Sequence, residues 1–413
     1  MNASFTHVLG EAFFADPYPT YARLREQPGP AFFEPEQTWL VSRYEQVAVV
    51  LKDARFSKQL PPTDRSPLSR TMLFQDPPRH RRLRESVAVA FTPQRIRQLT
   101  DHIGVVADRL IDGFERRGRV DFIADFAMPL PVSLIAEMLG VPTDAASRMC
   151  QWTEALVRAG APGVTDQGVL QAGGAAIAAM AAFFSDRITD ERRRPGETLL
   201  AGLLEANVEG GRLDDEELLG TCMLLMIAGH ETTVNLLGNG LHLLLTHPDQ
   251  RDLLQRQPEL MPSAVEEMLR FESPVQRGTH RRTTEPVELG GTTIPTGSLV
   301  GALIGSANRD PDVFPEPDRL DIRRTPNPHL AFGNGVHYCL GATLAREEAA
   351  IGLSRLFARL PGVRLAPAAA VQANKRDWLR AWWRSPAPTD STAGPLWRPN
   401  PIVRGLVALP IAW

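Results

Sequence analysis

The sequence predicts a mainly α-helical protein with minor β-structure, and two observations support this prediction. Segments with helical signals dominate the chain, and turn residues such as Gly140-Val141-Pro142 and Gly210-Gly211 separate them. One segment, from about 214 to 246, would span roughly 50 Å as a helix at 1.5 Å per residue, which is the length of a central helix in a large domain. No repeat or clear linker divides the 413 residues. We therefore expect one domain, residues 1–413.

The remaining elements follow from local signals. Pro28-Gly29 ends the first helix, Pro262 suits the first turn of another, and Asp214 with Glu217 has the spacing of a capping box. Helices are expected over residues 17–27, 44–52, 78–90, 94–117, 126–139, 143–158, 167–190, 196–206, 214–246 and 262–271, and from near 339 onward. Strands are expected over 31–33 and 38–41 as a hairpin, and over 287–289, 292–294 and 299–303, with a loop over 57–70 and a proline-rich meander over 308–330.

The composition excludes several classes of protein. Hydrophobic residues make up 43% and charged residues 23%, as in average globular proteins, which excludes long disorder and a multi-span membrane protein. The net charge of -3 gives no general attraction to nucleic acid. The N-terminus has no basic region followed by an apolar stretch. We expect a bacterial, cytoplasmic protein with no membrane span and no nucleic-acid partner.

The three cysteines do not suit a disulfide framework, because their number is odd and low. Cys150 and Cys222 have no motif around them and are expected to be ordinary buried thiols. Cys339 differs, because it directly precedes the last long helix, whose free N–H groups and dipole stabilise a thiolate. The surrounding stretch reads Phe332-Gly333-Asn334-Gly335-Val336-His337-Tyr338-Cys339-Leu340-Gly341.

This stretch resembles the haem-binding loop of the cytochrome P450 family, FGxGxHxCxG, at every defined position. The resemblance implies the cytochrome P450 fold, with small β-sheets around one buried haem b, and it makes Cys339 the axial ligand of the iron. An electron-rich thiolate ligand favours O–O cleavage. Phe332 would pack near the sulfur, and His337 would donate to a haem propionate. Gly333 and Gly341 would let the backbone approach the porphyrin.

The long helix carries a polar run at its centre, Ala228-Gly229-His230-Glu231-Thr232-Thr233. It resembles the family's oxygen-activation motif, AGx[DE]T, with Ala228 beside the haem. Thr232 would bind an oxygen species or a carbonyl of the preceding turn, and Glu231 would relay protons from solvent. His230 fills a variable position and is not expected to be a ligand. The alternative is a helix kink whose hydroxyls are satisfied locally.

Three further charged groups extend the resemblance. His80 and Arg84, in the stretch DPPRHRRLR, match the bacterial pattern DPPxHxxxR and would face the haem propionates. Arg281 would be another propionate partner, because buried carboxylates need charge-assisted donors. Arg282 is the neighbouring alternative, and His280 is a less favoured one.

Glu267 and Arg270 match the family's ExxR pattern, with both charges on one face of a helix. The resemblance implies that Arg319, in the meander, joins this pair and that the three residues fold the haem-loop side. A lone ExxR usually marks a solvated helix face, which is the alternative.

The resemblance places a substrate opposite Cys339. Candidate walls of the substrate pocket are Met72 to Phe74, Leu156 to Val169, Leu225 to Gly229 and Val275 to Thr279. They suit a medium-sized organic molecule, although plain core packing explains each apolar residue equally well. Arg277 and His280 would add polar contacts or be exposed to solvent.

Electrons must come from other proteins, because the chain has no further cysteine cluster and no flavin motif. The resemblance implies a ferredoxin and a ferredoxin reductase, so that NAD(P)H acts only indirectly. Arg79, Arg81 and Arg82 would attract an acidic partner, or they form an arginine-rich surface without one. We expect a monomer.

One segment departs from the family. Residues 368–395 appear as an atypical insertion of about twenty residues, and Trp378, Trp382 and Trp383 alternate there with arginines. A basic aromatic helix can contact a membrane surface or a partner. Packing on the domain is the alternative that we favour.

Together these features predict a haem-thiolate monooxygenase. It would insert one oxygen atom from O₂ into a small organic substrate, by hydroxylation or epoxidation, in secondary metabolism. A non-catalytic haem sensor and a peroxide-driven haem enzyme are the alternatives. The intact pair of Glu231 and Thr232 counts against the sensor, because a sensor needs no proton relay, and it also weakens the peroxide-driven alternative.

Overall fold

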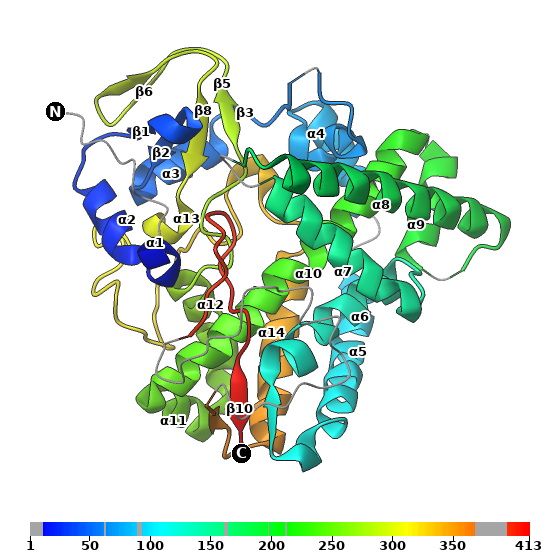
Figure 1. Cartoon of the computed structure of the whole chain (residues 1–413), viewed down its shortest axis with the longest axis vertical. Helices are drawn as coiled ribbons and strands as arrows, with labels where there is room; N and C mark the ends of the chain where they lie inside the picture. Colours follow the sequence, from blue (N-terminus) through cyan, green and yellow to red (C-terminus); the bar gives the residue numbers. More distant parts are fainter. Residues whose placement is uncertain are drawn as a thin grey trace.

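A computed structural model of the chain describes residues 11–61, 63–88, 93–160, 164–196, 198–210, 213–367 and 395–413. The insertion predicted at 368–395, with its tryptophans, lies almost entirely outside these residues. Helices dominate the described part, as predicted (Figure 1). They are α1 (Glu11–Ala15), α2 (Tyr18–Arg25), α3 (Tyr44–Lys52), α4 (Arg79–Ala88), α5 (Pro93–Asp112), α6 (Pro129–Met138), α7 (Thr143–Ala159), α8 (Gln167–Arg193), α9 (Leu199–Gly210), α10 (Asp215–Thr246), α11 (Pro248–Arg256), α12 (Met261–Phe271), α13 (Ile304–Ala307) and α14 (Ala342–Arg359).

The strands form small sheets at the side of the molecule that carries α2 (Tyr18–Arg25) and at the C-terminal end (Figure 1). One sheet has the order β1 (Ala31–Phe33), β2 (Thr38–Val41), β8 (Leu299–Ala302), β5 (Arg281–Thr283) and β3 (Phe56–Ser57). A second joins β4 (Arg119–Asp121), β10 (Pro410–Ala412) and β9 (Arg364–Leu365), and a third pairs β6 (Val287–Leu289) with β7 (Thr292–Ile294). The predicted hairpin is confirmed, with Ala31 opposite Leu40. The sequence analysis missed β3, β4, β5, β9 and β10, because strands of two or three residues carry almost no periodic signal.

The long helix α10 passes through the middle of the helical region (Figure 1). It begins with the predicted capping box: Glu217 N–H donates to Asp214 Oδ1 at 2.8 Å, and Asp214 N–H donates to Glu217 Oε2 at 3.1 Å. The buried Glu217 carboxylate also accepts from Arg79 at 2.8 Å and Arg82 at 2.6 Å. These contacts fasten α4 to the first turn of α10. They also favour an arginine surface without a partner, since Arg79 and Arg82 are engaged and Arg81 pairs with Glu85.

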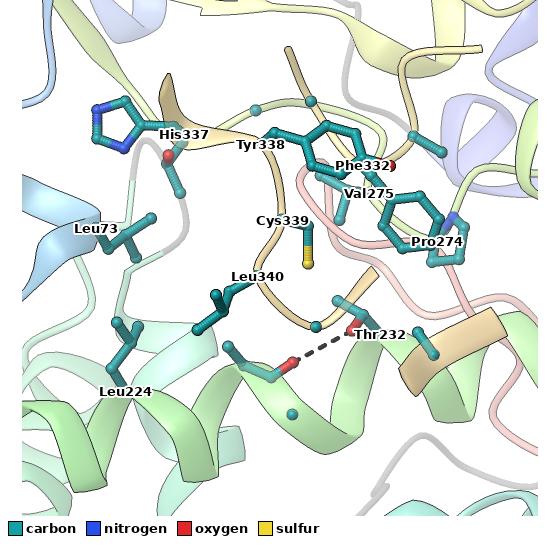
Figure 2. A pocket seen from close by; sticks show the side chains of 18 of the residues that line it. Leu73, Leu224, Thr232, Pro274, Val275, Phe332, His337, Tyr338, Cys339 and Leu340 are labelled. Carbon is teal, nitrogen blue, oxygen red and sulfur yellow. Dashed lines mark hydrogen bonds between the residues drawn. The ribbon is translucent and has the colours of Figure 1, made fainter. Parts of the chain in front are cut away.

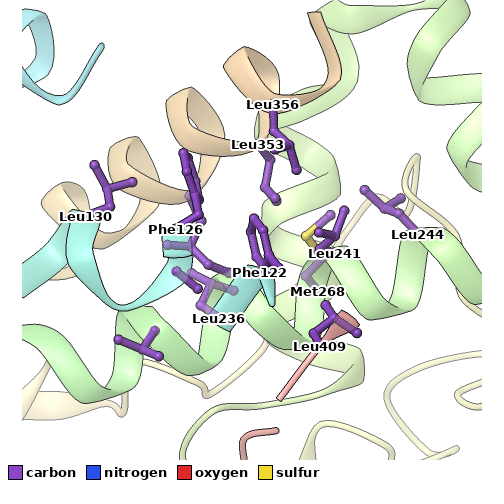
Figure 3. Packing of buried hydrophobic residues seen from close by; sticks show 14 of the residues in the cluster. Phe122, Phe126, Leu130, Leu236, Leu241, Leu244, Met268, Leu353, Leu356 and Leu409 are labelled. Atoms are coloured by element: carbon purple, nitrogen blue, oxygen red, sulfur yellow. The ribbon is translucent and has the colours of Figure 1, made fainter. Parts of the chain in front are cut away.

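The largest apolar core lies where α10, α12 and α14 meet (Figure 3). Phe122 and Phe126 stack there with ring centroids 5.3 Å apart, and Leu241, Met268 and Leu353 come from the three helices. Each such buried side chain contributes about 1.5–3 kcal/mol. Phe126 belongs to a π-helical turn, Ile123–Ala127, so α6 begins later than the predicted residue 126. This core fixes the helix that follows Cys339 relative to the helix that carries Thr232.

The ExxR pair on α12 is wholly buried. Arg270 donates to both oxygens of Glu267 at 2.8 Å. Its remaining N–H groups donate to main-chain carbonyls of the meander, including those of Asn308 at 3.0 Å and Pro317 at 2.9 Å. The alternative of a solvated helix face is therefore wrong.

The prediction that Arg319 is the third member of this network is wrong. The side chain of Arg319 is exposed and pairs with Glu316 at 3.1 Å, while only its carbonyl accepts from Arg270, at 3.3 Å. Arg324 takes the expected place and donates Nε to Glu267 at 3.2 Å. The chain turns between the two positions, so the inward-facing arginine lies five residues later than expected.

One described helix, α8, is long and apolar enough by length and composition to cross a membrane, with a mean hydropathy of 1.5 in its most apolar window. This is weak evidence, because core helices of water-soluble proteins meet the same criterion. Met180, Phe184 and Ile188 face inward from α8 and are buried. The helix packs along α7 and α10.

Candidate active site

The loop before α14 has the tight backbone that its glycines predict. Gly333 and Gly335 adopt φ angles of 77° and 72°, in the region that favours glycine. A Cβ at Gly335 would also lie 3.0 Å from the Cα of Lys52. The loop closes where the N–H of Cys339 donates to the carbonyl of Phe332 at 2.9 Å. Phe332 and Cys339 are thereby held on the same side of a cavity.

The sulfur of Cys339 points into this cavity, towards α10 (Figure 2). The side chain is exposed to the cavity, but the surrounding protein desolvates the sulfur, and this burial raises the pKa of the thiol. A hydrogen bond from the backbone of Gly341 and the charges of Arg84 and Arg346 act in the opposite direction and lower it. Helix α14 begins at Ala342, so its N-terminal N–H groups also favour a thiolate.

The cavity has a volume of about 330 Å³, within the usual range for small-molecule sites. On the side opposite Cys339 it is lined by Ala228, Gly229 and Thr232 of α10. The hydroxyl of Thr232 donates to the carbonyl of Ala228 at 3.3 Å (Figure 2). That bond is long, so the hydroxyl can exchange it for a bound molecule.

Most of the remaining wall is apolar, with Met72, Leu73, Leu224, Leu225 and Val275 among the lining residues. Three of the four predicted wall segments therefore contribute, although Phe74 does not. The fourth, Leu156 to Val169, contributes none of its described residues to the lining. Residues that line one cavity from distant loops cannot be selected by local apolarity alone.

Two predicted polar contacts are also wrong. Arg277 is buried away from the cavity and pairs with Glu36 at 2.8 Å. His280 does not line the cavity either, and burial and neighbouring cations lower its pKa to about 4. Both residues precede β5, in which Arg281 takes the inward position and Arg282 the outward one.

The predicted propionate partners come together at one end of the cavity. His80, Arg84, Arg281 and His337 all line it, and the rings of His80 and His337 lie 4.3 Å apart between centroids. Burial lowers the pKa of His337 to about 2, with a further contribution from nearby cations, the first of them Lys58. Burial likewise lowers the pKa of His80. Both imidazoles are therefore neutral donors at pH 7.

Arg281 rather than Arg282 faces the cavity. It donates to the carbonyls of Phe56 and Leu51, each at 3.1 Å, and burial lowers its pKa to about 10. Arg282 is exposed and donates to the carbonyl of Gly297. Of the two neighbouring arginines that the sequence analysis considered, the favoured one is thus the one that faces the cavity.

Glu231 lies beside the cavity and not in its lining. Its carboxylate pairs at 3.2 Å with Arg398 from the C-terminal segment. Burial raises the pKa of Glu231, and Arg398 lowers it. Burial raises the pKa of Glu154, on α7, to about 7, and the charges of Glu231 and Arg398 raise and lower it respectively. A chain of ionisable groups thus runs from α7 to the residue next to Thr232.

The sequence analysis missed two titratable residues that line the cavity. Lys58 is buried, and its only sequence signal is that it is one of three lysines among 45 basic residues. Glu348 is also buried, and burial raises its pKa to about 8. The sequence signal that could have identified Glu348 is its place on the inward face of α14, next to the buried Ala349.

The donor set fits a haem. A thiol faces the cavity, apolar residues cover its walls, and donors gather at one end, where two propionates would need them. A Cβ added to Gly341 would meet no protein atom within 4 Å, which leaves space beside the sulfur for a flat ring. Arg346 stacks on the Phe332 ring with its guanidinium carbon 4.4 Å from the ring centroid. This contact holds the aromatic side chain near the sulfur.

Among the described residues no group of three His, Cys, Asp or Glu side chains offers a separate metal site.

Comparisons with known proteins agree with this geometry. Residues 171–361 match the family model for cytochrome P450. The chain is 42% identical to the cytochrome P450 monooxygenase PikC of Streptomyces venezuelae, over 98% of this chain and 93% of that protein. It is 43% identical to the vitamin D(3) 25-hydroxylase of Pseudonocardia autotrophica, over 86% and 89%. The solved structure of the cytochrome P450 PksS of the Bacillus subtilis bacillaene polyketide synthase superposes with a TM-score of 0.85 at 36% identity, over 98% and 99% of the two chains.

Identity over nearly the whole length extends the agreement beyond the motifs. Members of this family carry haem b, act on small organic substrates and receive electrons from NAD(P)H through redox partners. The fold, the cysteine loop and these relatives therefore show that the chain belongs to the cytochrome P450 family and is a haem-containing monooxygenase.

Proposed function

We propose that this enzyme hydroxylates or epoxidises a medium-sized, largely apolar molecule of bacterial secondary metabolism, with electrons from a ferredoxin and a ferredoxin reductase. The arrangement that carries the proposal is the Cys339 sulfur facing Thr232 across an apolar cavity. A bound haem supplies the oxygen chemistry, with Cys339 as its iron ligand. A haem sensor needs no proton relay, and a peroxide-driven enzyme needs no protons from solvent to reduce O₂, so the pair of Glu231 and Thr232 supports the monooxygenase over both.

In this proposal one group of residues holds the haem in place and takes no part in the chemistry. His80, Arg84, Arg281 and His337 donate to the propionates, and Phe332 limits water at the sulfur. Ala228, Gly333 and Gly341 leave room for the ring, because side chains larger than methyl at these positions would occupy the space that it needs. The donors, drawn from α4, β5 and the cysteine loop, fix the ring from several directions.

Thr232 and Glu231 deliver protons in this proposal. The Thr232 hydroxyl holds a proton at Oγ1, and Glu231 resupplies it from the surface. Arg398 partly offsets the effect of burial on Glu231, since the arginine lowers a pKa that burial raises. A raised pKa suits a group that must both take and give a proton near neutral pH.

The walls favour an apolar substrate. Met72, Leu73, Leu224, Leu225 and Val275 supply aliphatic contacts. Among the relatives, PksS is named as a cytochrome P450 of polyketide biosynthesis and another as a vitamin D(3) 25-hydroxylase. A polyketide, peptide or terpenoid of similar size is therefore the class that we propose.

The proposed working form is a cytoplasmic monomer whose single domain spans the chain. The motifs from Asp76 to Arg346 all contribute to one site, which supports one functional unit. The three cysteines leave no set for an iron–sulfur cluster beside the haem ligand. This supports a ferredoxin and a ferredoxin reductase as the electron carriers.

Two measurements test the proposal. The reduced protein with carbon monoxide is expected to show the red-shifted Soret band of a thiolate-bound haem, and Cys339→His is expected to abolish that shift. Substrate-dependent NAD(P)H consumption with ferredoxin and reductase then separates a monooxygenase from a sensor. Turnover with hydrogen peroxide alone, at the rate of the complete electron chain, would favour the peroxide-driven alternative.

Thr232→Ala is expected to leave haem binding intact and to lower product formed per NAD(P)H by about a hundredfold, the lower end of the usual range for a proton-transfer group. Thr221→Ala is the matched control, because Thr221 is a buried threonine of the same helix outside the cavity lining. An unchanged ratio of product to NAD(P)H in Thr232→Ala would remove the hydroxyl from the mechanism.

A further inference from the structure

Lys58 is a buried lysine that the proposed mechanism does not use. It directly follows β3, is 4% exposed and lines the cavity. Its ammonium donates to the hydroxyl of Thr279 and lies 5.8 Å from the centroid of the Phe74 ring. Among the described residues no carboxylate lies within ion-pair distance of Nζ. A buried ammonium is costly unless an anion pairs with it.

The groups around Lys58 are mostly cationic. Its charge lowers the pKa values of His80, His280 and His337, and Arg281 in turn lowers the pKa of Lys58. Burial is the largest cause, and together these effects bring the pKa of Lys58 down to about 7. The ammonium thus occupies a position where the protein alone destabilises it.

In the part of the chain that the structure describes, Asp76 is the carboxylate that acts on Lys58, and it is already occupied. It accepts from the hydroxyl of Ser57 and from the backbone N–H of Lys58 at 3.0 Å. Three side chains that are cations in solution, Lys58, Arg84 and Arg281, line the same end of the cavity. With one carboxylate beside them, this end has an excess of two positive charges. A haem brings two propionates, which is the number needed for neutrality.

We propose that Lys58 is a further cofactor-positioning residue, whose ammonium binds a haem propionate together with Arg84 and Arg281. The inference rests on the proposed placement of the haem in this cavity. It explains why a lysine lies buried beside two arginines and why Thr279 provides only a neutral partner. The bound propionate would also draw a proton onto Lys58, since an adjacent anion raises the pKa of an amine.

A carboxylate on the substrate is the competing occupant. The position of Lys58 favours the propionate, because the same cations that border the lysine border the predicted propionate donors His80 and His337. The apolar wall at Leu224 and Leu225 contains no such cluster. The substrate alternative is therefore an outcome of the test.

The experiment compares the holoenzyme of Lys58→Met with Lys58→Arg and with Lys52→Met, an exposed lysine at the end of α3 as the matched control. Haem loss is followed as transfer to excess apomyoglobin, and the haem reduction potential is measured without substrate. Lys58→Met is expected to accelerate haem loss by about tenfold or more, equivalent to at least ~1.4 kcal/mol. The reduction potential is expected to fall, because loss of a nearby cation favours the ferric state.

Lys58→Arg keeps the charge and is expected to restore most of both values, and Lys52→Met is expected to match the unmodified protein. The proposal would be overturned if the rate of haem loss in Lys58→Met changed by less than about twofold and the haem reduction potential did not shift. So would a selective loss of affinity for myristate, but not for its methyl ester, because Lys58 would then serve a substrate carboxylate.

A second variant covers the case in which Lys58→Met yields no holoenzyme. Thr279→Val removes the hydroxyl that orients the ammonium and leaves the charge, so a smaller acceleration of haem loss is expected, and none would overturn the proposal. Failure of the proposed function itself is separate, because it would appear as a missing thiolate Soret band in the unmodified protein.

Discussion

Replacing Glu267 with glutamine is expected to destabilise the protein by about 3–5 kcal/mol, the usual effect of leaving a buried charge without its partner. Both oxygens of Glu267 accept from N–H groups. Oε1 accepts from Arg270, Arg324 and the backbone of Asp321, and Oε2 accepts from Arg270 and Asn327, at 2.8–3.2 Å. A glutamine amide turned either way would place an NH₂ against a donor. Arg270, which is 0% exposed, would keep its charge.

Such a loss is a large part of the total stability of about 5–15 kcal/mol that is usual for a folded domain. The assay is urea unfolding of the holoenzyme at 25 °C, followed by circular dichroism and by the Soret band. Haem content after purification is expected to fall as well, because Asp321 and Asn327 lie on the segment that leads to the cysteine loop.

The neighbouring Glu266→Gln is the matched control. Glu266 is 31% exposed and pairs with Arg346 at 2.6 Å and His329 at 3.0 Å, so we expect a loss of about 1 kcal/mol or less. A loss in Glu267→Gln below about 1 kcal/mol, or one no larger than in the control, would refute the argument from burial.

Three further changes test the surroundings of the site. Arg398→Met is expected to raise the pKa of Glu231 and so to move the pH profile of product formed per NAD(P)H to higher pH; an unmoved profile would contradict the role of the ion pair. His230 has a folded pKa of about 4 against an ordinary 6.5, so the folded state binds fewer protons and stability is lost as pH falls from 6.5 towards 4. His230→Asn should therefore lose about 2 kcal/mol less between pH 7 and pH 4.5, and equal losses in urea titrations would argue against it. Gly405→Ala would put a Cβ 1.9 Å from the amide oxygen of Asn235, so we expect a loss of about 1–3 kcal/mol in thermal unfolding, and an unchanged melting temperature would disprove the clash.

Features encoded within one turn of chain could be predicted from the sequence. The capping box at Asp214 and Glu217 is local, and the structure contains both of its hydrogen bonds. The cysteine loop was recognisable because its glycines and its cysteine occur at fixed spacing. His80, Arg84 and Arg281 were likewise placed by their motifs, and they line one cavity.

Features that depend on how distant segments meet could not be predicted in the same way. Lys58 lies in a loop rich in proline, serine and arginine, and its side chain is buried because β3 pairs with β5 and because Thr279 and Phe74 lie beside the ammonium. Arg319 and Arg324 have the same local chemistry, and the path of the meander decides which one reaches Glu267. The wall expected from Leu156 to Val169 failed for the same reason, since apolar residues there can pack between helices instead.

The division of the cavity has a consequence for the evolution of the enzyme. The cationic end and the cysteine loop are tied into networks of charges, and substitution there disturbs the folded protein or its cofactor. The aliphatic wall, formed by residues such as Leu73, Leu224 and Val275, has no ionic partners to lose. Mutations can accumulate in this wall and alter which molecule is accepted while the oxidising apparatus stays the same. A duplicated gene of this kind can therefore diversify towards new metabolites in small steps, and directed evolution of its selectivity should begin at these positions.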